Sequence, residues 1–217
     1  MKRLARHFLA PMLMAAGAAH ADGAGLLVAA AGGDAAAIRA EIAAGTPVDT
    51  RNTKGETALL IATHQNQVEA AVALIAAGAD VNARDGIDDS PYLYAGARGH
   101  IEILRLTLDH GADLASVNRF GGTALIPAAE RGLVDTVALL IEAGVDVDHV
   151  NRLGWTALME AVLLADGGPR HQRIVQLLLA GGADPNIADF DGVTPLAHAR
   201  RMGLDEMAAI IVAGGGR

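Results

Sequence analysis

The sequence contains no cysteine among its 217 residues, and only 3% of its residues are aromatic. Without cysteine the chain can form no disulfide, no thiolate-bound zinc site, no cysteine nucleophile and no lipid-modified cysteine. A chain of this length can bury enough apolar surface to fold without such cross-links. Apolar residues are abundant, at 52%, and most of them are alanine, leucine, valine and isoleucine. This composition predicts slender helices that pack closely, and it excludes a disordered chain.

Basic residues are also scarce, and the formal net charge is −8. Three of the basic residues, Lys2, Arg3 and Arg6, fall within the first 21 positions, which contain no acid. The rest of the chain therefore has 14 basic residues against 25 acidic ones, a net charge of −11. We expect so acidic a body to repel nucleic-acid phosphates and anionic lipids, so neither is a predicted partner.

Residues 1–21 have the composition of a signal peptide. The basic start leads into an apolar stretch from Phe8 to Ala19, and Ala19-His20-Ala21 gives the small-x-small pattern of a cleavage site. The alternative is an amphipathic first helix of the folded domain. The apolar stretch is too short to span a bilayer and contains Pro11, so no membrane insertion of the mature chain is expected. The pattern predicts an exported protein, periplasmic or secreted, whose folded part is 22–217.

This folded part repeats with a period of 33 residues. The last interval is longer, 38 residues, in every one of the four columns. The columns are Thr57, Ser90, Thr123, Thr156 and Thr194; Ala62, Ala95, Ala128, Ala161 and Ala199; Gly45, Gly78, Gly111, Gly144 and Gly182; and Asn52, Asp85, Asn118, Asn151 and Asp189. Four columns in phase over more than 150 residues indicate a repeat architecture.

The columns describe two short helices and a turn in each unit. The Thr or Ser is typical of a helix N-cap, and Pro91 and Pro195 follow it where a proline loses no hydrogen bond. The alanine column is expected where helices cross with room only for a methyl group. Asn66, Gly99, Gly132 and Gly203, nine residues after the cap, are residue types that tolerate a left-handed backbone between two helices.

On these motifs the chain resembles the ankyrin-repeat family. The family motif Thr-Pro-Leu-His-x-Ala is matched by Thr57-Ala58-Leu59-Leu60-Ile61-Ala62 and by four further copies, the last from Thr194 to Ala199. The resemblance covers residues 24 to about 213. It implies an all-α solenoid of about six stacked helix-turn-helix units with protruding β-type turns. The expected units are 24–51, which is an N-terminal cap, and 52–84, 85–117, 118–150, 151–188 and 189–213.

The chain departs from the family pattern in three ways. The motif histidine is replaced by Leu60, Leu93, Ile126, Met159 and Ala197, so apolar packing is expected in place of its hydrogen bond. Asp88 stands where the other turns have glycine, so the third turn is expected to be reshaped. The extra residues of the long unit fall near 164–170 and are expected to form a loop, either with a role or merely tolerated.

A search for reactive groups predicts no catalytic residue, no metal site and no cofactor. Ser90 and Ser116 are the only serines, and neither lies in a Gly-x-Ser-x-Gly setting. No histidine pair has helical zinc-site spacing, and no phosphate-binding loop is present. The segment 184–192 is rich in oxygen ligands but lacks the ligand order of a calcium loop. His171 is expected to be the most exposed histidine and the one with a candidate role.

By resemblance, a partner would contact the turn tips and the exposed side of the first helix of each unit. Aromatic and arginine residues dominate binding hot spots, and several lie at these positions. Phe120, Trp155 and Phe190, flanked by Arg119, Arg131 and Arg152, are the predicted centre of the site, and Tyr94, Arg98 and Leu153 complete it. The alternative is that the aromatic rings fold over neighbouring turns and seal the stack. Tyr92 is expected in the core.

The predicted function is therefore an exported, monomeric protein–protein interaction scaffold without catalysis, whose protein partner the sequence does not identify. Three alternatives remain. The chain could bind a small molecule or a metal near the insertion, it could be an enzyme with an unrecognised pair of acids, or it could assist a periplasmic oxidative-stress enzyme such as catalase.

Overall fold

The computed structural model describes residues 23–164 and 166–217. The predicted signal peptide at 1–21 lies outside these residues. The described residues form twelve α-helices and no strand, apart from one isolated β-bridge between Arg51 and Thr57 at the base of a turn. This confirms the all-α prediction.

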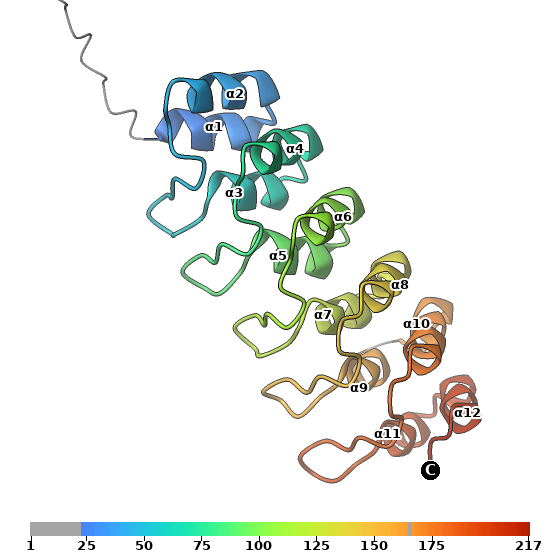
Figure 1. Ribbon diagram of the computed structural model, residues 1–217. Helices are drawn as coiled ribbons and strands as arrows, with labels where there is room; N and C mark the ends of the chain where they lie inside the picture. The colour runs from blue at the N-terminus through green and yellow to red at the C-terminus, as the bar shows by residue number, and fades with distance from the viewer. Residues whose placement is uncertain (1–22, 165) are drawn as a thin grey trace, which may run out of the picture.

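The helices follow one another as six antiparallel pairs (Figure 1). In chain order they are α1 (Ala24–Gly32), α2 (Ala35–Ala43), α3 (Ala58–His64), α4 (Val68–Ala76), α5 (Pro91–Arg98), α6 (Ile101–Asp109), α7 (Leu125–Glu130), α8 (Val134–Glu142), α9 (Ala157–Leu163), α10 (Pro169–Ala180), α11 (Pro195–Arg201) and α12 (Asp205–Ala213).

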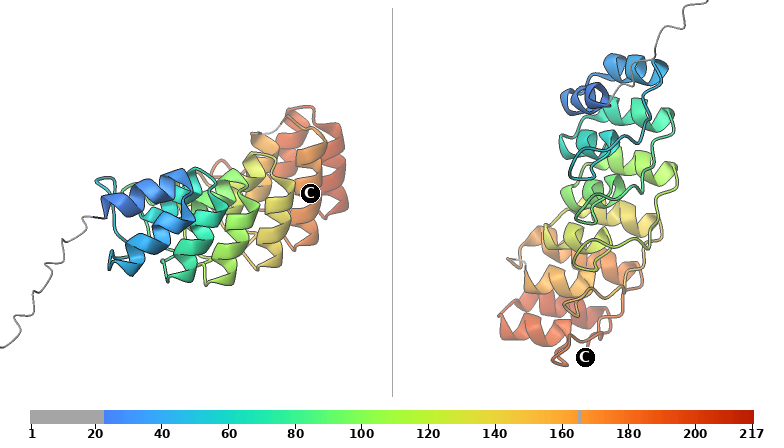
Figure 2. Two further views of the ribbon diagram at one scale, coloured as in Figure 1. Left: turned by 90° about the horizontal axis from the view of Figure 1, so that it is seen from above. Right: turned by 90° about the vertical axis from the view of Figure 1, so that its left-hand side faces the viewer.

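The pairs stack into an elongated two-layer array (Figure 2). Each odd-numbered helix packs on the next odd-numbered one, and the even-numbered helices form the second layer. The long turns project beside the odd-numbered layer (Figure 1). The five alanines of the repeat column are all fully buried, as predicted, because a larger side chain would push the helix pairs apart. Tyr92 is fully buried in the same core.

Four of the five predicted helix caps are present. The hydroxyl oxygens of Thr57, Ser90, Thr156 and Thr194 each accept the backbone N–H of the third residue that follows, at 3.2–3.3 Å. This contact satisfies one of the free N–H groups at the start of each odd-numbered helix. The four positions predicted to be left-handed also have positive φ, between 53° at Asn66 and 73° at Gly99.

The cap predicted at Thr123 is wrong, and Pro127 explains why. In the other units the backbone carbonyl of the Thr or Ser accepts the N–H of the fourth residue that follows, as Ile61 donates to Thr57. Pro127 occupies that position after Thr123 and has no N–H. The N–H of Ile126 donates to the Thr123 carbonyl instead, at 3.3 Å. The buried Thr123 hydroxyl therefore has no hydrogen-bond partner.

Each turn is organised by its Asn or Asp residue, a role that the repeat pattern alone does not reveal. The Oδ1 atom of Asn151 accepts the N–H groups of Leu153 and Trp155, and the equivalent atoms of the other turns make the same two contacts. These side-chain contacts close the turn together with its backbone hydrogen bonds, such as that from Asn151 to the Trp155 carbonyl.

Asp88 does not reshape the third turn, contrary to expectation. Its φ of 65° is close to the 82° of Gly55, and its N–H donates to Asp85 as that of Gly55 donates to Asn52. What changes is the contact with the following turn. Gly86 donates to the Lys54 carbonyl and Arg152 to that of Phe120, but no described bond joins Arg119 to Ile87. The equivalent bond between Phe190 and Leu153 is also not among the described bonds, although Gly154 stands in that turn, so its absence does not depend on the residue at this position.

The inserted residues form both a loop and a helix extension. Residues 166–168 are described as loop, and α10 then begins at Pro169, which fixes the backbone of the first turn. As a result α10 has 12 residues, whereas α8 has nine. The prediction of a simple loop over 164–170 is therefore wrong at its C-terminal end.

The replacement of the motif histidine by apolar packing is confirmed in four units. Leu60, Leu93, Ile126 and Met159 are each at most 3% exposed. In the last unit it is wrong, since Ala197 is exposed.

Candidate functional site

Two pockets lie side by side between the turns and the odd-numbered helices in the middle of the array. They share Asn118, Phe120, Pro127 and Glu130, which form the boundary between them. We call the first the arginine pocket and the second the tryptophan pocket. The arginine pocket measures about 130 Å³, and its other lining residues include Asp89, Tyr94, Arg98, Arg119 and Arg131. The tryptophan pocket measures about 200 Å³.

The tryptophan pocket has apolar walls and carboxylates inside. Its walls are Phe120, Ile126, Pro127, Leu153, Trp155 and Leu164, and its polar lining includes Glu130, Asn151 and Glu160. Phe120, Leu153 and Leu164 are each at least 50% exposed. Large apolar side chains that gather at a hollow, instead of packing in the core, are typical of a binding surface.

Glu160 is the unusual group of this pocket because only 5% of its surface is exposed. Burial raises the pKa of its carboxyl to about 7, and the charge of Glu130 raises it further. A 2.8 Å hydrogen bond from Nδ2 of Asn151 to Oε1 of Glu160 opposes this shift. The pocket therefore holds a carboxyl group that exchanges its proton near neutral pH.

In the arginine pocket the guanidinium groups are held by local contacts. Arg119 lies 3.8 Å from a carboxylate oxygen of Asp89 and 4.8 Å from the ring centroid of Phe120. Arg98 lies 5.3 Å from the ring centroid of Tyr94, and Arg131 donates to the Ala97 carbonyl on the preceding unit. These contacts order the long side chains before any partner binds, which lowers the entropy cost of binding.

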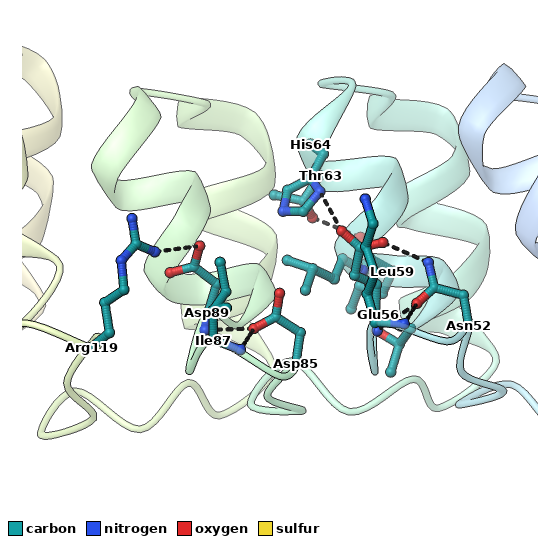
Figure 3. Close-up of polar contacts among 12 residues, drawn as sticks. Asn52, Glu56, Leu59, Thr63, His64, Asp85, Ile87, Asp89 and Arg119 are labelled. Carbon is teal, nitrogen blue, oxygen red and sulfur yellow. Dashed lines mark hydrogen bonds and ion pairs between the residues drawn. The ribbon is translucent and has the colours of Figure 1, made fainter.

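A separate polar cluster lies on the preceding unit beside α3, where Asn52, Glu56 and His64 contact one another (Figure 3). Nδ1 of His64 lies 3.5 Å from Oε1 of Glu56, whose other oxygen accepts a hydrogen bond from Asn52. The His64 ring is 4.2 Å from the ring of Tyr94, centroid to centroid. Burial raises the pKa of Asp89, as does the charge of Asp85, while Arg119 opposes the shift.

Seven of the nine predicted site residues line these two pockets, and Arg152 and Phe190 do not. The Arg152 guanidinium donates to the Arg119 carbonyl at 2.7 Å and so links two turns. The Phe190 ring is 77% exposed, yet one of its faces fills the space where a Cβ on Gly154 would lie. For Phe190 the geometry thus agrees with the alternative in which an aromatic ring covers the neighbouring turn.

The expectation that His171 is the most exposed histidine is wrong, since only 8% of its surface is exposed. Its Nε2 atom lies 3.0 Å from the Glu130 carbonyl at the end of α7, and its Nδ1 atom lies 3.3 Å from Asp166. The added first turn of α10 carries the ring back onto α7, so His171 ties the insertion to the array.

A larger hollow of about 400 Å³ lies in the other layer, between the ends of α6 and α8. It contains no predicted site residue, and its rim is formed by Arg105, Asp109 and Glu142. Over residues 23–164 and 166–217, no group of three or more His, Asp or Glu side chains is arranged to hold a metal ion. No helix in the same ranges is long and apolar enough to cross a membrane.

Sequence reasoning missed Glu160, although the repeat register contains the information. Tyr94 is one of the predicted site residues, and Glu160 lies 66 residues later, which is two full repeats. Its position four residues after the cap therefore directs it to the same side of the first helix in its unit. The burial that shifts its pKa could not be read from this register, because it depends on Trp155, Leu164 and α7.

Comparison with protein families gives a match to the family model described as ankyrin repeats in three copies. The model matches residues 26–118 and, with some overlap, 92–189. Among curated proteins, YahD of Escherichia coli (strain K12), which is named as an ankyrin repeat protein, is 49% identical over 57 residues. That match covers 26% of this chain and 28% of the length of YahD.

Solved structures resemble nearly the whole described array. A crystal structure of an ankyrin repeat domain from Acinetobacter baumannii AYE is 57% identical, with a TM-score of 0.87, and the alignment covers 88% of this chain and 98% of that one. The ankyrin repeat protein EF0377 is 46% identical, with a TM-score of 0.83, over 87% and 96% of the two chains. The ankyrin repeat domain of Bcl-3, a member of the IκB protein family, is 29% identical, with a TM-score of 0.80, over 89% and 86%.

Proposed function

This chain belongs to the ankyrin-repeat family, a fold typical of protein–protein interaction modules, and from that premise we propose that it is a non-catalytic scaffold that binds another protein. The proposed binding surface is the pair of adjoining pockets beside the odd-numbered helices. A stacked array presents such a surface without moving, because each unit is fixed by its two neighbours.

The observation that carries this proposal is the placement of Phe120 at the boundary of both pockets with 54% of its surface exposed. Arg119 lies against the same ring, and Trp155 lines the pocket beyond it. Aromatic and arginine side chains carry a large share of binding energy in protein interfaces. An exposed aromatic ring between two hollows contributes little to folding, so binding is the better explanation of its position.

The test is affinity capture of partners, followed by mass spectrometry, with the wild type and two double variants. Phe120→Ala with Trp155→Ala is expected to lose at least tenfold in affinity for the captured protein. The matched control is Val72→Ala with Val212→Ala, which removes exposed apolar groups from the even-numbered layer and should bind normally. Thermal unfolding of each variant separates lost binding from lost folding. Full binding by a folded Phe120→Ala/Trp155→Ala variant would refute the proposed surface.

We further propose that the protein acts outside the cytoplasm. The basic start, the apolar stretch and the small-x-small pattern within residues 1–21 support export. Cell fractionation followed by N-terminal sequencing should find a mature chain that begins at Asp22 in the exported fraction. A chain that stays in the cytoplasm with Met1 or Lys2 as its first residue would contradict the proposal.

A further inference from the structure

The tryptophan pocket combines an apolar enclosure with two acidic groups that have no basic partner. Neither Glu130 nor Glu160 forms an ion pair with any lysine, arginine or histidine of residues 23–164 and 166–217. Arg131, which lines the adjoining arginine pocket together with Glu130, donates to the Ala97 carbonyl instead. Uncompensated carboxyl groups inside a hollow are costly, so a charge-complementary ligand would recover part of that cost.

The hydrogen bonds of Glu160 leave one of its oxygens available. Asn151 donates to Oε1, and no donor among the described residues reaches Oε2. Because Glu160 lines the pocket, a ligand group that enters can reach this second oxygen. Glu130 lines the same pocket from α7, so a single donor group with several protons can lie between the two carboxyl groups.

The walls favour a cation that is attached to an apolar stem. The faces of Phe120 and Trp155 attract a positive charge through their ring electrons, and Trp is the strongest of the aromatic side chains in this respect. Leu153, Ile126 and Leu164 line the remaining wall and match an aliphatic chain. Lysine and arginine side chains have this combination of an apolar stem and a charged end.

We propose that the tryptophan pocket binds a lysine or arginine side chain of the partner protein, held between the rings of Phe120 and Trp155 and the carboxyl groups of Glu130 and Glu160. This inference rests on the proposed function and names the chemistry of its partner. The raised pKa of Glu160 fits such a role, since an entering cation would draw the proton off the carboxyl group.

A polypeptide, and not a free amine, is the expected source of the cation because of the neighbouring arginine pocket. Arg98, Arg119 and Arg131 line that pocket, and it shares the Phe120 wall with the tryptophan pocket. Two adjoining pockets of opposite charge suit a segment with a basic and an acidic side chain close together in its sequence. A free amine would occupy only one of them.

The experiment selects random twelve-residue peptides, displayed on phage, against the full folded domain. Trp155 is the only tryptophan of the chain, so its fluorescence reports the occupancy of the pocket directly. The selected peptides are expected to share one lysine or arginine position. Replacement of that residue by norleucine should weaken binding at least tenfold, because the stem remains but the charge is lost.

Two protein variants make the test specific. Glu160→Gln keeps the shape and the contact with Asn151 but removes one of the two charges. It should bind the lysine peptide more weakly than the wild type does and reduce the difference between the lysine and norleucine peptides, because only Glu130 remains. Glu142→Gln, which removes an exposed acid from α8 in the other layer, should behave as the wild type. n-Butylamine at the same concentration as the peptides should leave the Trp155 fluorescence unchanged.

The outcomes separate this inference from the proposed function. Peptides that bind without a basic residue, or that bind Glu160→Gln as well as the wild type, would refute the proposal that a basic side chain enters the pocket. They would not contradict the proposed scaffold function. Binding of n-butylamine as tight as that of the peptides would point to a small amine as the ligand and overturn the inference. A domain that selects no peptide and captures no partner would refute both proposals.

Discussion

Asn151 connects the tip of a turn with the buried acid of the neighbouring helix. Its Oδ1 atom accepts the N–H groups of Leu153 and Trp155, while its Nδ2 atom donates to Oε1 of Glu160 at 2.8 Å. One side chain thereby holds both Trp155 and Glu160, which line the tryptophan pocket. The protonation of Glu160 and the geometry of Trp155 are therefore coupled, and the first two predictions follow from that coupling.

Glu160→Gln is expected to remove a pH dependence of stability. Because the pKa of Glu160 is raised from 4.5 to about 7, the folded protein holds a proton between pH 4.5 and 7 that the unfolded chain has released. The free energy of unfolding therefore falls as the pH rises through this window. Between pH 5 and pH 8 the free energy of unfolding of the wild type should fall by about 1–2 kcal/mol more than that of the variant. Solvent in the open pocket keeps the effect this small.

Urea unfolding of both proteins at pH 5, 6, 7 and 8 measures this difference directly. The difference cancels contributions from the histidines, which both proteins share. Glu142→Gln, with an exposed carboxyl, serves as the control and should follow the wild-type curve. A Glu160→Gln curve parallel to that of the wild type would show that Glu160 titrates normally.

Asn151→Asp is expected to destabilise the protein at high pH more than at low pH. The new carboxylate can still close the turn, as Asp85 and Asp189 do in theirs, but it cannot donate to Glu160. At pH 8 two negative groups would then face each other, at a cost of about 1–3 kcal/mol. At pH 5 the protonated Glu160 can donate, so the cost should be smaller.

Asn118→Asp is the matched control for this change. Asn118 occupies the same column and accepts the N–H groups of Phe120 and Gly122, but Pro127 stands where Glu160 lies in the next unit. Its substitution should alter stability by less than about 0.5 kcal/mol at either pH. Equal effects of the two substitutions, measured by urea unfolding, would argue against a coupling of Asn151 with Glu160.

Thr156→Val and Thr123→Val are expected to differ, although both residues are buried and belong to one column. The Thr156 hydroxyl caps α9 through the N–H of Met159, so its loss should cost about 1 kcal/mol. The Thr123 hydroxyl has no partner, so its removal should be neutral or stabilise by up to about 1 kcal/mol.

The dependence on Pro127 can be tested by repeating Thr123→Val in a Pro127→Ala background. The restored N–H at position 127 should donate to the Thr123 carbonyl. The N–H of Ile126, which now donates to that carbonyl, could then donate to the Thr123 hydroxyl instead. In that background Thr123→Val should cost about 1 kcal/mol by urea unfolding, like the loss of any other cap. A neutral effect in both backgrounds would refute this explanation.

Asp88→Gly is expected to stabilise the protein by about 0.5–1 kcal/mol. Asp88 has a φ of 65°, which is unfavourable for a residue with a Cβ but readily adopted by glycine. The lost ion pair with Arg84, 3.9 Å apart and exposed, is worth little. Asp88→Ala also loses the pair but keeps a Cβ, so thermal unfolding should show no gain for it.

Much of this architecture follows from local rules that can be applied to the sequence alone. The spacing of the Thr, Ala and Gly columns sets the number, order and pairing of the helices, because caps, close crossings and left-handed linkers depend on the residues at the position itself. Seven of the nine binding positions that the family resemblance implies, Tyr94 and Trp155 among them, also meet at adjoining pockets.

Other features were decided only when the units packed together. The burial of His171, and part of that of Glu160, depends on α7, about 30 to 40 positions earlier in the chain, and no local pattern records that contact. The position of Phe190 over Gly154, instead of at a pocket, is likewise a contact between two turns. Repeat spacing determines the position of a residue on its helix or turn, but the neighbouring units determine what its side chain contacts and how much of it stays exposed to water. That second step sets the pKa of Glu160 and the charge of the pocket.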